Sequence, residues 1–277
     1  MDVRYSTDPE GFKRMTTEEL RTAFLIDNLF VPDEVPMTYS DIDRSITGSA
    51  VPVSTTLKLL ATKKEMAAEY FCDRREVGII NIGGEGTVTV DGKPFTLATK
   101  DALYIGRGSK DVTFASASKT TPAKFYFVSY PAHKDYPTTK TTIAEADKSH
   151  LGSKKDANER TINRMIHLKG IQSCQLVMGL TELEEGCVWN TMPSHTHQRR
   201  SEVYMYYNIG PDALVIHLMG QPTETRHMIM RECQAVLNPS WSIHSGTGTR
   251  SYSFIWAMGG ENQVFDDMDG VTMGDFK

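Results

Sequence analysis

The feature that most restricts the fold of this 277-residue chain is a series of short β-branched and aromatic segments, separated by turn residues. The first series consists of EVGIINIGG, GTVTVDG, PFTLA, DALYIG, VTFAS and KFYFVSY, between Glu76 and Tyr130. Within it, Asp91-Gly92 is typical of a two-residue hairpin turn. Six strands spaced by roughly ten residues predict a barrel or a sandwich rather than alternating βα units.

A second series of strand-like segments follows, so the chain has two similar halves. It consists of CQLVMGL, VWNTM, EVYMYYNI, ALVIHLM, HMIMR, QAVLN and SYSFIWAM. The run RREV followed by IINIGGEG resembles the later run RRSEV followed by MYYNIG, which indicates an internal duplication. We therefore predict a mainly all-β chain of two barrels, with an N-terminal barrel over residues 1–130 and a C-terminal barrel with an acidic tail over residues 161–277. Residues 131–160 are polar and are predicted to be the linker.

One helix is expected before the strands, in the segment TTEELRTAFLIDNLF. Thr16 and Glu19 have the spacing of a capping box, in which each residue satisfies a free backbone N–H group of the other. Leu20 and Phe24 follow at helical rather than alternating spacing. We interpret this segment as a short helix that packs on one of the barrels.

A cluster of metal-ligating residue types marks the second half. His195 and His197 are two residues apart, and side chains at that spacing on a strand share one face. Glu202 follows after enough chain to turn and return a carboxylate, and His244 lies in the turn-rich stretch NPSWSIHSG. Three imidazoles and a carboxylate leave coordination positions open, which is typical of catalytic rather than structural metal sites.

The pattern HxHxxxxE with a later PxxxxH resembles the two metal-binding motifs of the cupin superfamily of small β-barrels. Gly186 and Gly210 stand where the glycines that flank the first motif belong, whereas Trp241 occupies the glycine position of the second motif. The turn before His244 is therefore expected to be wider than usual. The first half has Phe71-Cys72-Asp73 where the histidine pair would be, so we predict that the N-terminal barrel has lost its metal and has a structural role.

Composition excludes several other classes of function. A net charge of -5 and the lack of a Lys or Arg run argue against nucleic acid or an anionic membrane as a partner. The four cysteines show no CxxC spacing and predict neither a disulfide framework nor a thiolate zinc site. No stretch approaches the roughly 18 apolar residues of a membrane helix, and the start is too polar for a signal peptide. We expect a cytoplasmic protein.

Longer motifs give a closer resemblance. The segments WNTMPSHTHQRRSEVYMY, MGQPTETRH, NPSWSIHSG and GGENQVFDDMD are similar to those of the 5-keto-4-deoxyuronate isomerase family of bacterial pectin breakdown, and the similarity runs almost from end to end. It implies a two-barrel cupin with one zinc ion at the cluster and a homo-oligomer, a hexamer. The implied reaction is an aldose-ketose isomerisation of an acidic sugar, 5-dehydro-4-deoxy-D-glucuronate, to 3-deoxy-D-glycero-2,5-hexodiulosonate.

Such a reaction needs a base that moves a proton between neighbouring carbons. Glu202 is expected to be a ligand, which leaves Glu261, Tyr252 and His217 as candidates; a hydrogen-bonded core position explains His217 equally well. Residues 261–263 follow a strand of the second barrel and are expected to fold over its mouth.

The substrate carboxylate also needs a cation, and Arg199 or Arg226 is the expected partner, since a guanidinium binds a carboxylate through two parallel hydrogen bonds. A structural ion pair is the alternative for each arginine. Trp241 is expected in the wall of the substrate site. The sequence leaves open whether the metal is zinc, manganese, iron or nickel. It also leaves open a cupin dioxygenase and a sugar-acid-binding protein without catalysis.

Overall fold

The computed structural model describes residues 1–277, and its chain divides into two compact units. The first unit consists of Met1–Val3, Asn28–Asp147 and Met165–Val177. The second consists of Arg4–Asp27, Lys148–Arg164 and Met178–Lys277. These bounds differ from the predicted 1–130 and 161–277, because both units contain segments from distant parts of the chain.

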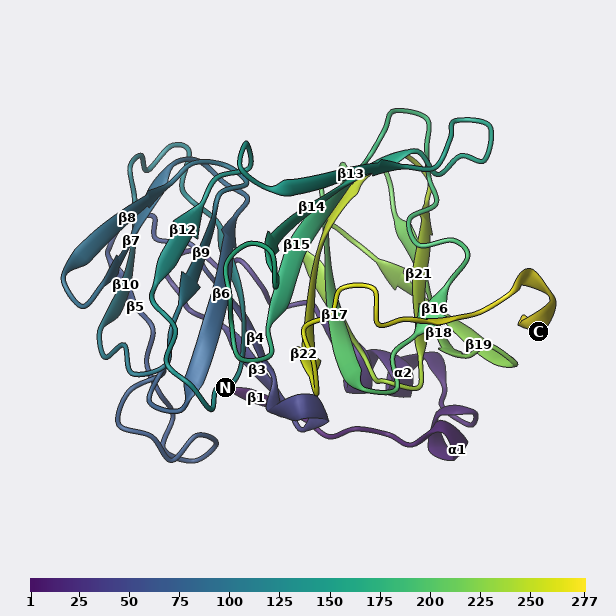
Figure 1. Cartoon of the computed structure of the whole chain (residues 1–277), viewed down its shortest axis with the longest axis horizontal. Coiled ribbons are helices and arrows are strands. Elements are labelled where there is room, and N and C mark those ends of the chain that lie inside the picture. Colours follow the sequence, from purple (N-terminus) through teal and green to yellow (C-terminus); the bar gives the residue numbers. More distant parts are fainter. The chain divides into compact units, whose positions relative to one another are not determined.

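The first unit contains two sheets (Figure 1). In spatial order, the strands of its seven-stranded sheet are β1 (Asp2–Arg4), β3 (Met37–Ser40), β4 (Ile46–Ala50), β11 (Phe125–Pro131), β6 (Arg75–Asn81), β9 (Ala102–Ile105) and β12 (Thr139–Thr141). Those of its four-stranded sheet are β5 (Leu57–Lys58), β10 (Val112–Ser116), β7 (Gly86–Val90) and β8 (Lys93–Leu97). All six strands predicted in the first series are present.

The second unit has a seven-stranded sheet of its own, of β13 (Asp147–Leu151), β14 (Arg160–Ile166), β15 (Val177–Leu183), β22 (Ser253–Gly260), β17 (Arg200–Tyr207), β20 (Gln234–Asn238) and β2 (Leu25–Ile26). A three-stranded sheet consists of β19 (Glu224–Met230), β18 (Val215–Gln221) and β21 (Ile243–Gly248). A short pair is formed by β16 (His195–Thr196) and β23 (Asp269–Gly270).

The two units repeat one topology, which agrees with the predicted duplication. The order β4-β11-β6-β9 in the first unit corresponds to β15-β22-β17-β20 in the second, and β10-β7-β8 corresponds to β21-β18-β19. Arg75 begins β6 and Arg200 begins β17, as the matching sequence runs indicated. The predicted class, mainly β with a short N-terminal helix, is confirmed.

The N-terminal helix has the predicted cap. In α2 (Thr17–Phe24), the Thr16 hydroxyl accepts from the backbone N–H of Glu19, and the Glu19 carboxylate accepts from the backbone N–H of Thr16. A shorter helix, α1 (Pro9–Phe12), precedes it, and two short 3-10 turns lie at Ile42–Arg44 and Met273–Asp275. Leu25 and Ile26 follow α2 directly and pair with β20, so this segment belongs to the second unit.

Two strands lie in the stretch that the sequence predicted to be a linker, and one predicted strand is absent. The predicted linker, residues 131–160, contains β12 and β13 and the start of β14. β13 is polar and mostly exposed, so it lacks the apolar alternation by which strands are recognised. The segment VWNTM is irregular, apart from a single bridge between Trp189 and Thr247.

In the first unit, residues that correspond in sequence to the histidine pair belong to the hydrophobic core. Phe71 and Cys72 are buried among Val77, Ile79 and Phe127. Phe71 carries no ligand atom, and burial raises the pKa of the Cys72 thiol to about 12, which disfavours the thiolate form that binds metals.

A buried carboxylate holds a loop in the first unit. Glu76 is fully buried, and its oxygens accept hydrogen bonds from the backbone N–H groups of Cys174, Gln175 and Leu176 at 2.6, 2.9 and 2.8 Å. The Tyr104 hydroxyl donates a fourth bond at 2.8 Å. Four donors converge on one carboxylate, so the charge is stabilised without a basic partner.

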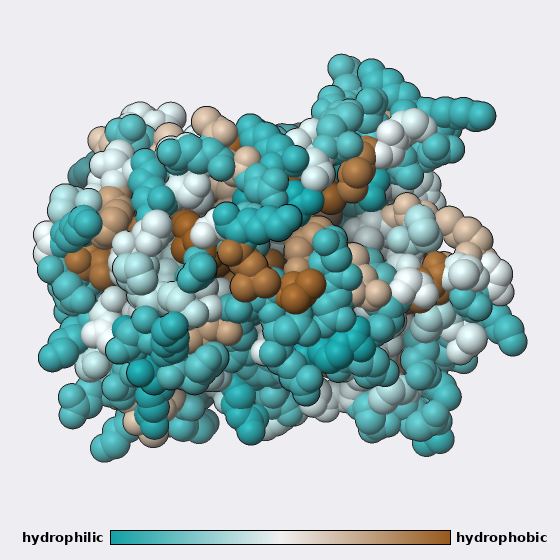
Figure 2. Space-filling view, in the orientation of Figure 1, coloured by the Kyte–Doolittle hydropathy of each residue, from teal (hydrophilic) through white to brown (hydrophobic).

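Few large apolar side chains are exposed. Figure 2 shows a face coloured mainly for hydrophilic residues, with hydrophobic ones in small groups. The exposed large apolar residues are spread along the chain: Tyr5, Leu60, Leu151, Leu168, Val264 and Met273. None of the helices has the length and apolarity needed to span a membrane.

Glu76→Gln should lower the free energy of unfolding by about 1–3 kcal/mol, because a glutamine amide nitrogen cannot accept the backbone N–H groups that remain buried. Urea denaturation measures the change. Glu69→Gln, at an exposed position of the same unit, is the matched control and should stay within about 0.5 kcal/mol of the parent. Equal stability of the two variants would contradict this account.

Candidate metal centre

The register of β17 determines which of its side chains face the interior of the second unit. β17 pairs antiparallel with β22 on one side and β20 on the other, with Glu202 opposite Met258 and Asn238. Side chains alternate along a strand, so Glu202 and Tyr204 share one face. Both line the cavity described below. The predicted carboxylate ligand is therefore placed by the central part of the sheet.

The histidines come from two short stretches around this face. His195 is in β16 and His197 follows that strand directly; the N–H of Arg200 then donates to the carbonyl of His197 at 3.3 Å, which closes a tight turn into β17. His244 is the second residue of β21, opposite Met219 of β18. Before His244, the N–H of Ser242 donates to the carbonyl of Pro239 at 3.0 Å, which closes a tight four-residue turn instead of the wide turn expected.

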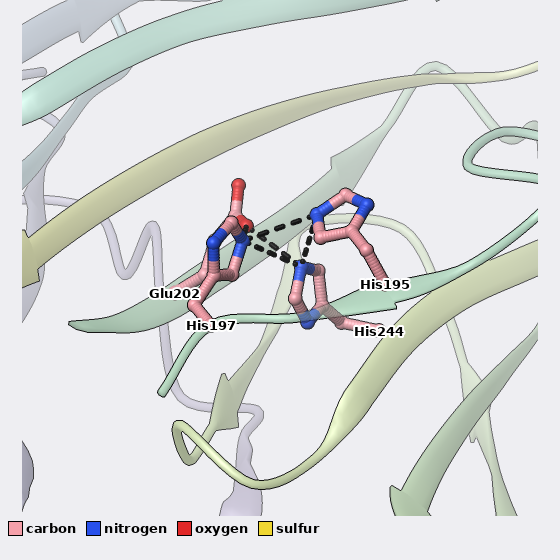
Figure 3. A group of neighbouring side chains, drawn as sticks. All are labelled: His195, His197, Glu202 and His244. Carbon is pink, nitrogen blue, oxygen red and sulfur yellow. Dashed lines mark hydrogen bonds and ion pairs between the residues drawn. The ribbon is translucent and has the colours of Figure 1, made fainter. Parts of the chain in front are cut away.

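The four predicted ligands converge (Figure 3). Their ligand atoms all lie within 4.8 Å of one another, and all four residues are buried. The three histidine Nε2 atoms are separated by 3.0–3.2 Å, and Glu202 Oε2 lies 3.0 Å from His197 Nε2 and 2.8 Å from His244 Nε2. Atoms that share one ion at about 2.0–2.2 Å are themselves about 3 Å apart, so this spacing suits a divalent metal ion.

Hydrogen bonds on the outer side of the rings orient them toward this centre. His197 Nδ1 donates to the carbonyl of Asp267 at 2.9 Å, and His244 Nδ1 donates to the carbonyl of Ser242 at 3.2 Å. With the proton on Nδ1, each Nε2 presents a lone pair to the centre. Lone pairs at this distance repel one another unless they share a cation. The residues present therefore fit a divalent ion.

The electrostatics of the cluster favour ligand forms of these groups. Burial, followed by the neighbouring His244 and His197, lowers the pKa of His195 to about 2, so this imidazole stays neutral. Burial alone would raise the pKa of Glu202, but the adjacent His244 and His197 hold the pKa of this carboxyl well below its usual value. Metal binding requires neutral imidazoles and an ionised carboxylate. The cluster can hold a metal ion.

A cavity of about 280 Å³ lies beside the cluster and is lined by His195 and Glu202. Its walls come from the inner faces of β14, β15, β17 and β22, with residues 265–268 of the C-terminal segment. Most of its lining is apolar, with Ile162, Phe254 and Met258 among the contributors. Small-molecule sites usually have volumes of about 300–1,000 Å³, so this cavity is at the small end of the range and suits a ligand no larger than a monosaccharide.

Arg199 is not in the cavity wall. Its guanidinium binds Asp267 at 2.5–3.0 Å and Asp269 at 2.9 Å. Hydrogen bonds from these two carboxylates raise the pKa of Arg199 further above its usual value. Arg200, buried beside it, donates to the carbonyls of Val264, Phe265 and Asp267. The arginine pair therefore fixes the C-terminal segment that covers one side of the cavity.

The three candidate bases also lie outside the cavity lining. His217 is fully buried between the Tyr206 hydroxyl at 2.7 Å and Asn238 Oδ1 at 2.8 Å, which is the core position considered as its alternative. Tyr252 donates to the carbonyl of Gly246 at 3.0 Å. Glu261 is exposed. The structure brings none of these side chains to the cavity.

The remaining predicted substrate contacts have other partners. Arg226 forms an ion pair with Glu224 at 2.7 Å and donates to the carbonyl of Lys13 at 2.5 Å. The Trp241 ring packs edge-on against Phe12, with ring centroids 5.1 Å apart. Arg226 therefore takes the structural role that was the alternative for it.

Sequence reasoning missed two charged residues in the cavity wall, Arg160 and Asp266. Arg160 lies in the stretch read as a linker. Asp266 belongs to the acidic tail, which does cover the cavity as expected, although the carboxylate in the cavity lining is that of Asp266, itself an exposed residue, rather than that of Glu261. The alternation of Arg160 and Ile162 along β14 was the one local signal that was available.

The duplicated β topology and the buried His₃Glu cluster beside a cavity define a cupin-type protein. Among solved structures, an IolB-like protein from Salmonella typhimurium LT2 has a TM-score of 0.68 at 12% identity, covering 82% of this chain and 87% of that one. A mutant of Bacillus subtilis oxalate decarboxylase has a TM-score of 0.53 at 11% identity, covering 79% and 69%. These similarities concern the fold.

The chain belongs to the KduI/IolB family, whose model matches residues 33–272. It is 53% identical over 277 residues to a protein from Caldicellulosiruptor bescii and 52% identical over 278 residues to one from Escherichia coli, with 100% of each chain covered. Both relatives are named 4-deoxy-L-threo-5-hexosulose-uronate ketol-isomerase. The chain is an isomerase enzyme.

His197→Ala should reduce bound metal from about one ion per chain to nearly none, because His197 Nε2 lies within 3.2 Å of each of the three other ligand atoms. Metal analysis of the purified, folded protein measures this. His227→Ala, which removes an exposed imidazole from β19, should keep the parental metal content. Parental metal in His197→Ala would exclude this cluster as the binding site.

Proposed function

We propose that this enzyme is a zinc-dependent aldose-ketose isomerase of uronate catabolism, which converts 5-dehydro-4-deoxy-D-glucuronate to 3-deoxy-D-glycero-2,5-hexodiulosonate. The main support is the His₃Glu cluster at the wall of a monosaccharide-sized cavity, in a chain whose relatives are named uronate ketol-isomerases. A homohexamer, implied by the sequence resemblance, is part of the proposal, and light scattering on the purified protein tests it.

His195, His197, Glu202 and His244 would hold the metal ion. When bound, zinc supplies a Lewis acid that polarises a carbonyl or hydroxyl oxygen of the sugar. Because His195 and Glu202 line the cavity, a ligand in the cavity reaches the cluster from that side. His197 and His244 are outside the cavity lining. They supply the other two ligands and are oriented by their Nδ1 hydrogen bonds.

The isomerisation removes a proton from the hydroxyl-bearing carbon and returns one to the neighbouring carbonyl carbon, so one base serves both steps if it can reach both carbons. Two carboxylates line the cavity, Glu202 and Asp266. Glu202 is committed to the cluster. We assign the proton transfer to Asp266, which the Arg199 and Arg200 contacts to its neighbours hold in the cavity wall.

Tyr204 supplies a hydrogen-bond donor to the same space. Its hydroxyl lies 3.1 Å from the Thr191 hydroxyl, and its ring packs edge-on against His244 with centroids 5.4 Å apart. Burial raises the pKa of Tyr204 well above its ordinary value, so the hydroxyl stays protonated. It can therefore donate to a sugar oxygen but does not act as a base.

Under anaerobic conditions, the purified protein should isomerise freshly prepared 5-dehydro-4-deoxy-D-glucuronate. The activity should be lost after chelation and return with added zinc, because the Lewis acid contributes several kcal/mol of transition-state stabilisation. A coupled or chromatographic assay of the ketose product measures turnover.

Three other outcomes of this assay would contradict the proposal or favour a different function. Full activity after complete removal of metal would reject metal dependence. Turnover only in the presence of oxygen, with oxygen consumed, would favour the cupin dioxygenase. Tight binding of the sugar acid without turnover would favour a binding protein.

Asp266→Asn should lower kcat by roughly 10²- to 10⁴-fold, the usual contribution of a general base, while the metal content stays parental. Steady-state kinetics and metal analysis measure the two quantities together. Asp212→Asn, at an exposed turn before β18, is the matched control with the same change of charge. A parental kcat in metal-loaded Asp266→Asn would assign the proton transfer to another group.

A further inference from the structure

The cavity beside the cluster contains one arginine and no lysine in its lining. The arginine is Arg160, the first residue of β14, and Ile162 lines the cavity two residues later on the same strand face. The other nitrogen base of the lining is the His195 imidazole, which belongs to the cluster. A permanent positive charge is therefore present at one place in an otherwise mainly apolar wall.

Arg160 differs in its partners from the two arginines that the sequence suggested as substrate contacts. Arg199 and Arg226 each form an ion pair with a carboxylate, at 2.5–3.0 Å and 2.7 Å. Arg160 Nη1 donates to the backbone carbonyl of Asn158 at 2.8 Å, and the structure provides no carboxylate for this guanidinium. That single bond fixes the orientation of the group and leaves most of its five donors free.

An unpaired guanidinium in a half-buried position is unfavourable. Burial lowers the pKa of Arg160 from its usual value, which reflects the cost of keeping the charge away from water. An anionic ligand that enters the cavity would offset this cost and would meet a planar fork suited to two parallel hydrogen bonds. A neutral sugar would leave the charge unpaired.

We propose that Arg160 binds the carboxylate of the substrate and thereby gives the enzyme its preference for sugar acids. The inference rests on the proposed function, since it concerns the opposite end of the same ligand from the reacting carbons. With the carboxylate at Arg160, the aldehyde end is directed to the cluster, because both line one cavity. The apolar side chains that form most of the remaining wall suit a sugar with a methylene carbon in place of a hydroxyl-bearing one.

The test compares Arg160→Ala, Arg160→Lys and the control Arg250→Ala, an exposed arginine before β22, in the metal-loaded enzyme. Arg160→Ala should raise KM for the uronate roughly 10- to 100-fold, as expected for loss of a charge-assisted hydrogen-bonded pair, with little change in kcat. Arg160→Lys should raise KM less, because it keeps the charge but loses the fork. Arg250→Ala should match the parent.

Chemical rescue separates binding from a structural role. Free guanidinium ion at non-denaturing concentration should lower the KM of Arg160→Ala toward the parental value and leave that of Arg250→Ala unchanged. Folded, metal-loaded Arg160→Ala with a parental KM overturns the inference. A rise in KM that accompanies loss of metal and is not reversed by guanidinium also overturns the inference.

Two further comparisons cover the cases in which Arg160→Ala does not fold or the parental enzyme has no isomerase activity. If Arg160→Ala does not fold, a parental KM in Arg160→Lys overturns the inference, because a lysine cannot reproduce two parallel hydrogen bonds. The parental enzyme is assayed first. Absence of isomerase turnover there rejects the proposed function and this inference with it, whereas turnover combined with an unchanged Arg160→Ala rejects this inference alone.

Discussion

The pairing of β17 with β22 and β20 is the constraint on which the site depends. Because Glu202 is opposite Met258 and Tyr204 is opposite Trp256, the inner faces of two strands become the floor of the cavity. A register shift of one residue would turn Glu202 away from the histidines and into the opposite face of the sheet. The carboxylate ligand and the cavity floor are therefore products of one set of backbone hydrogen bonds.

The C-terminal segment is as much a part of the site as the sheet. Arg199 holds it through Asp267 and Asp269, and Arg200 holds it through backbone carbonyls. In return, the carbonyl of Asp267 orients the ring of His197, and Asp266 is part of the cavity lining. One arginine pair thus links the orientation of a ligand to the position of the residue to which we assign the proton transfer.

The sequence was sufficient for the elements and the ligands whose signals are local. The capping box of α2, the Asp91-Gly92 hairpin between β7 and β8, and the spacing of His195, His197 and Glu202 all depend on residue types that are close together in the sequence. The duplication was visible because the runs around Arg75 and Arg200 begin equivalent strands. These features needed no knowledge of distant contacts.

The cavity residues required tertiary information. Arg199 has its partners about 70 residues further along the chain, at Asp267 and Asp269, so adjacency to the histidines gave no guide to its role. Arg160 is the first residue of β14, and the stretch before it is polar and lacks strand alternation. Which carboxylate of the acidic tail lines the cavity depends on how the tail is held, and it is Asp266 rather than Glu261.

The second unit is built from segments near both ends of the sequence, and this affects the order in which the protein folds during synthesis. It combines Arg4–Asp27 with Met178–Lys277, and β2 pairs with β20, so its sheet cannot be completed until nearly the whole polypeptide has left the ribosome. Domains generally fold as units during synthesis, N-terminal ones first. Here the earliest residues to emerge, including the capped helix, must remain unpaired while most of the first unit is translated. The half of the duplication that retains the cluster is therefore the last to assemble.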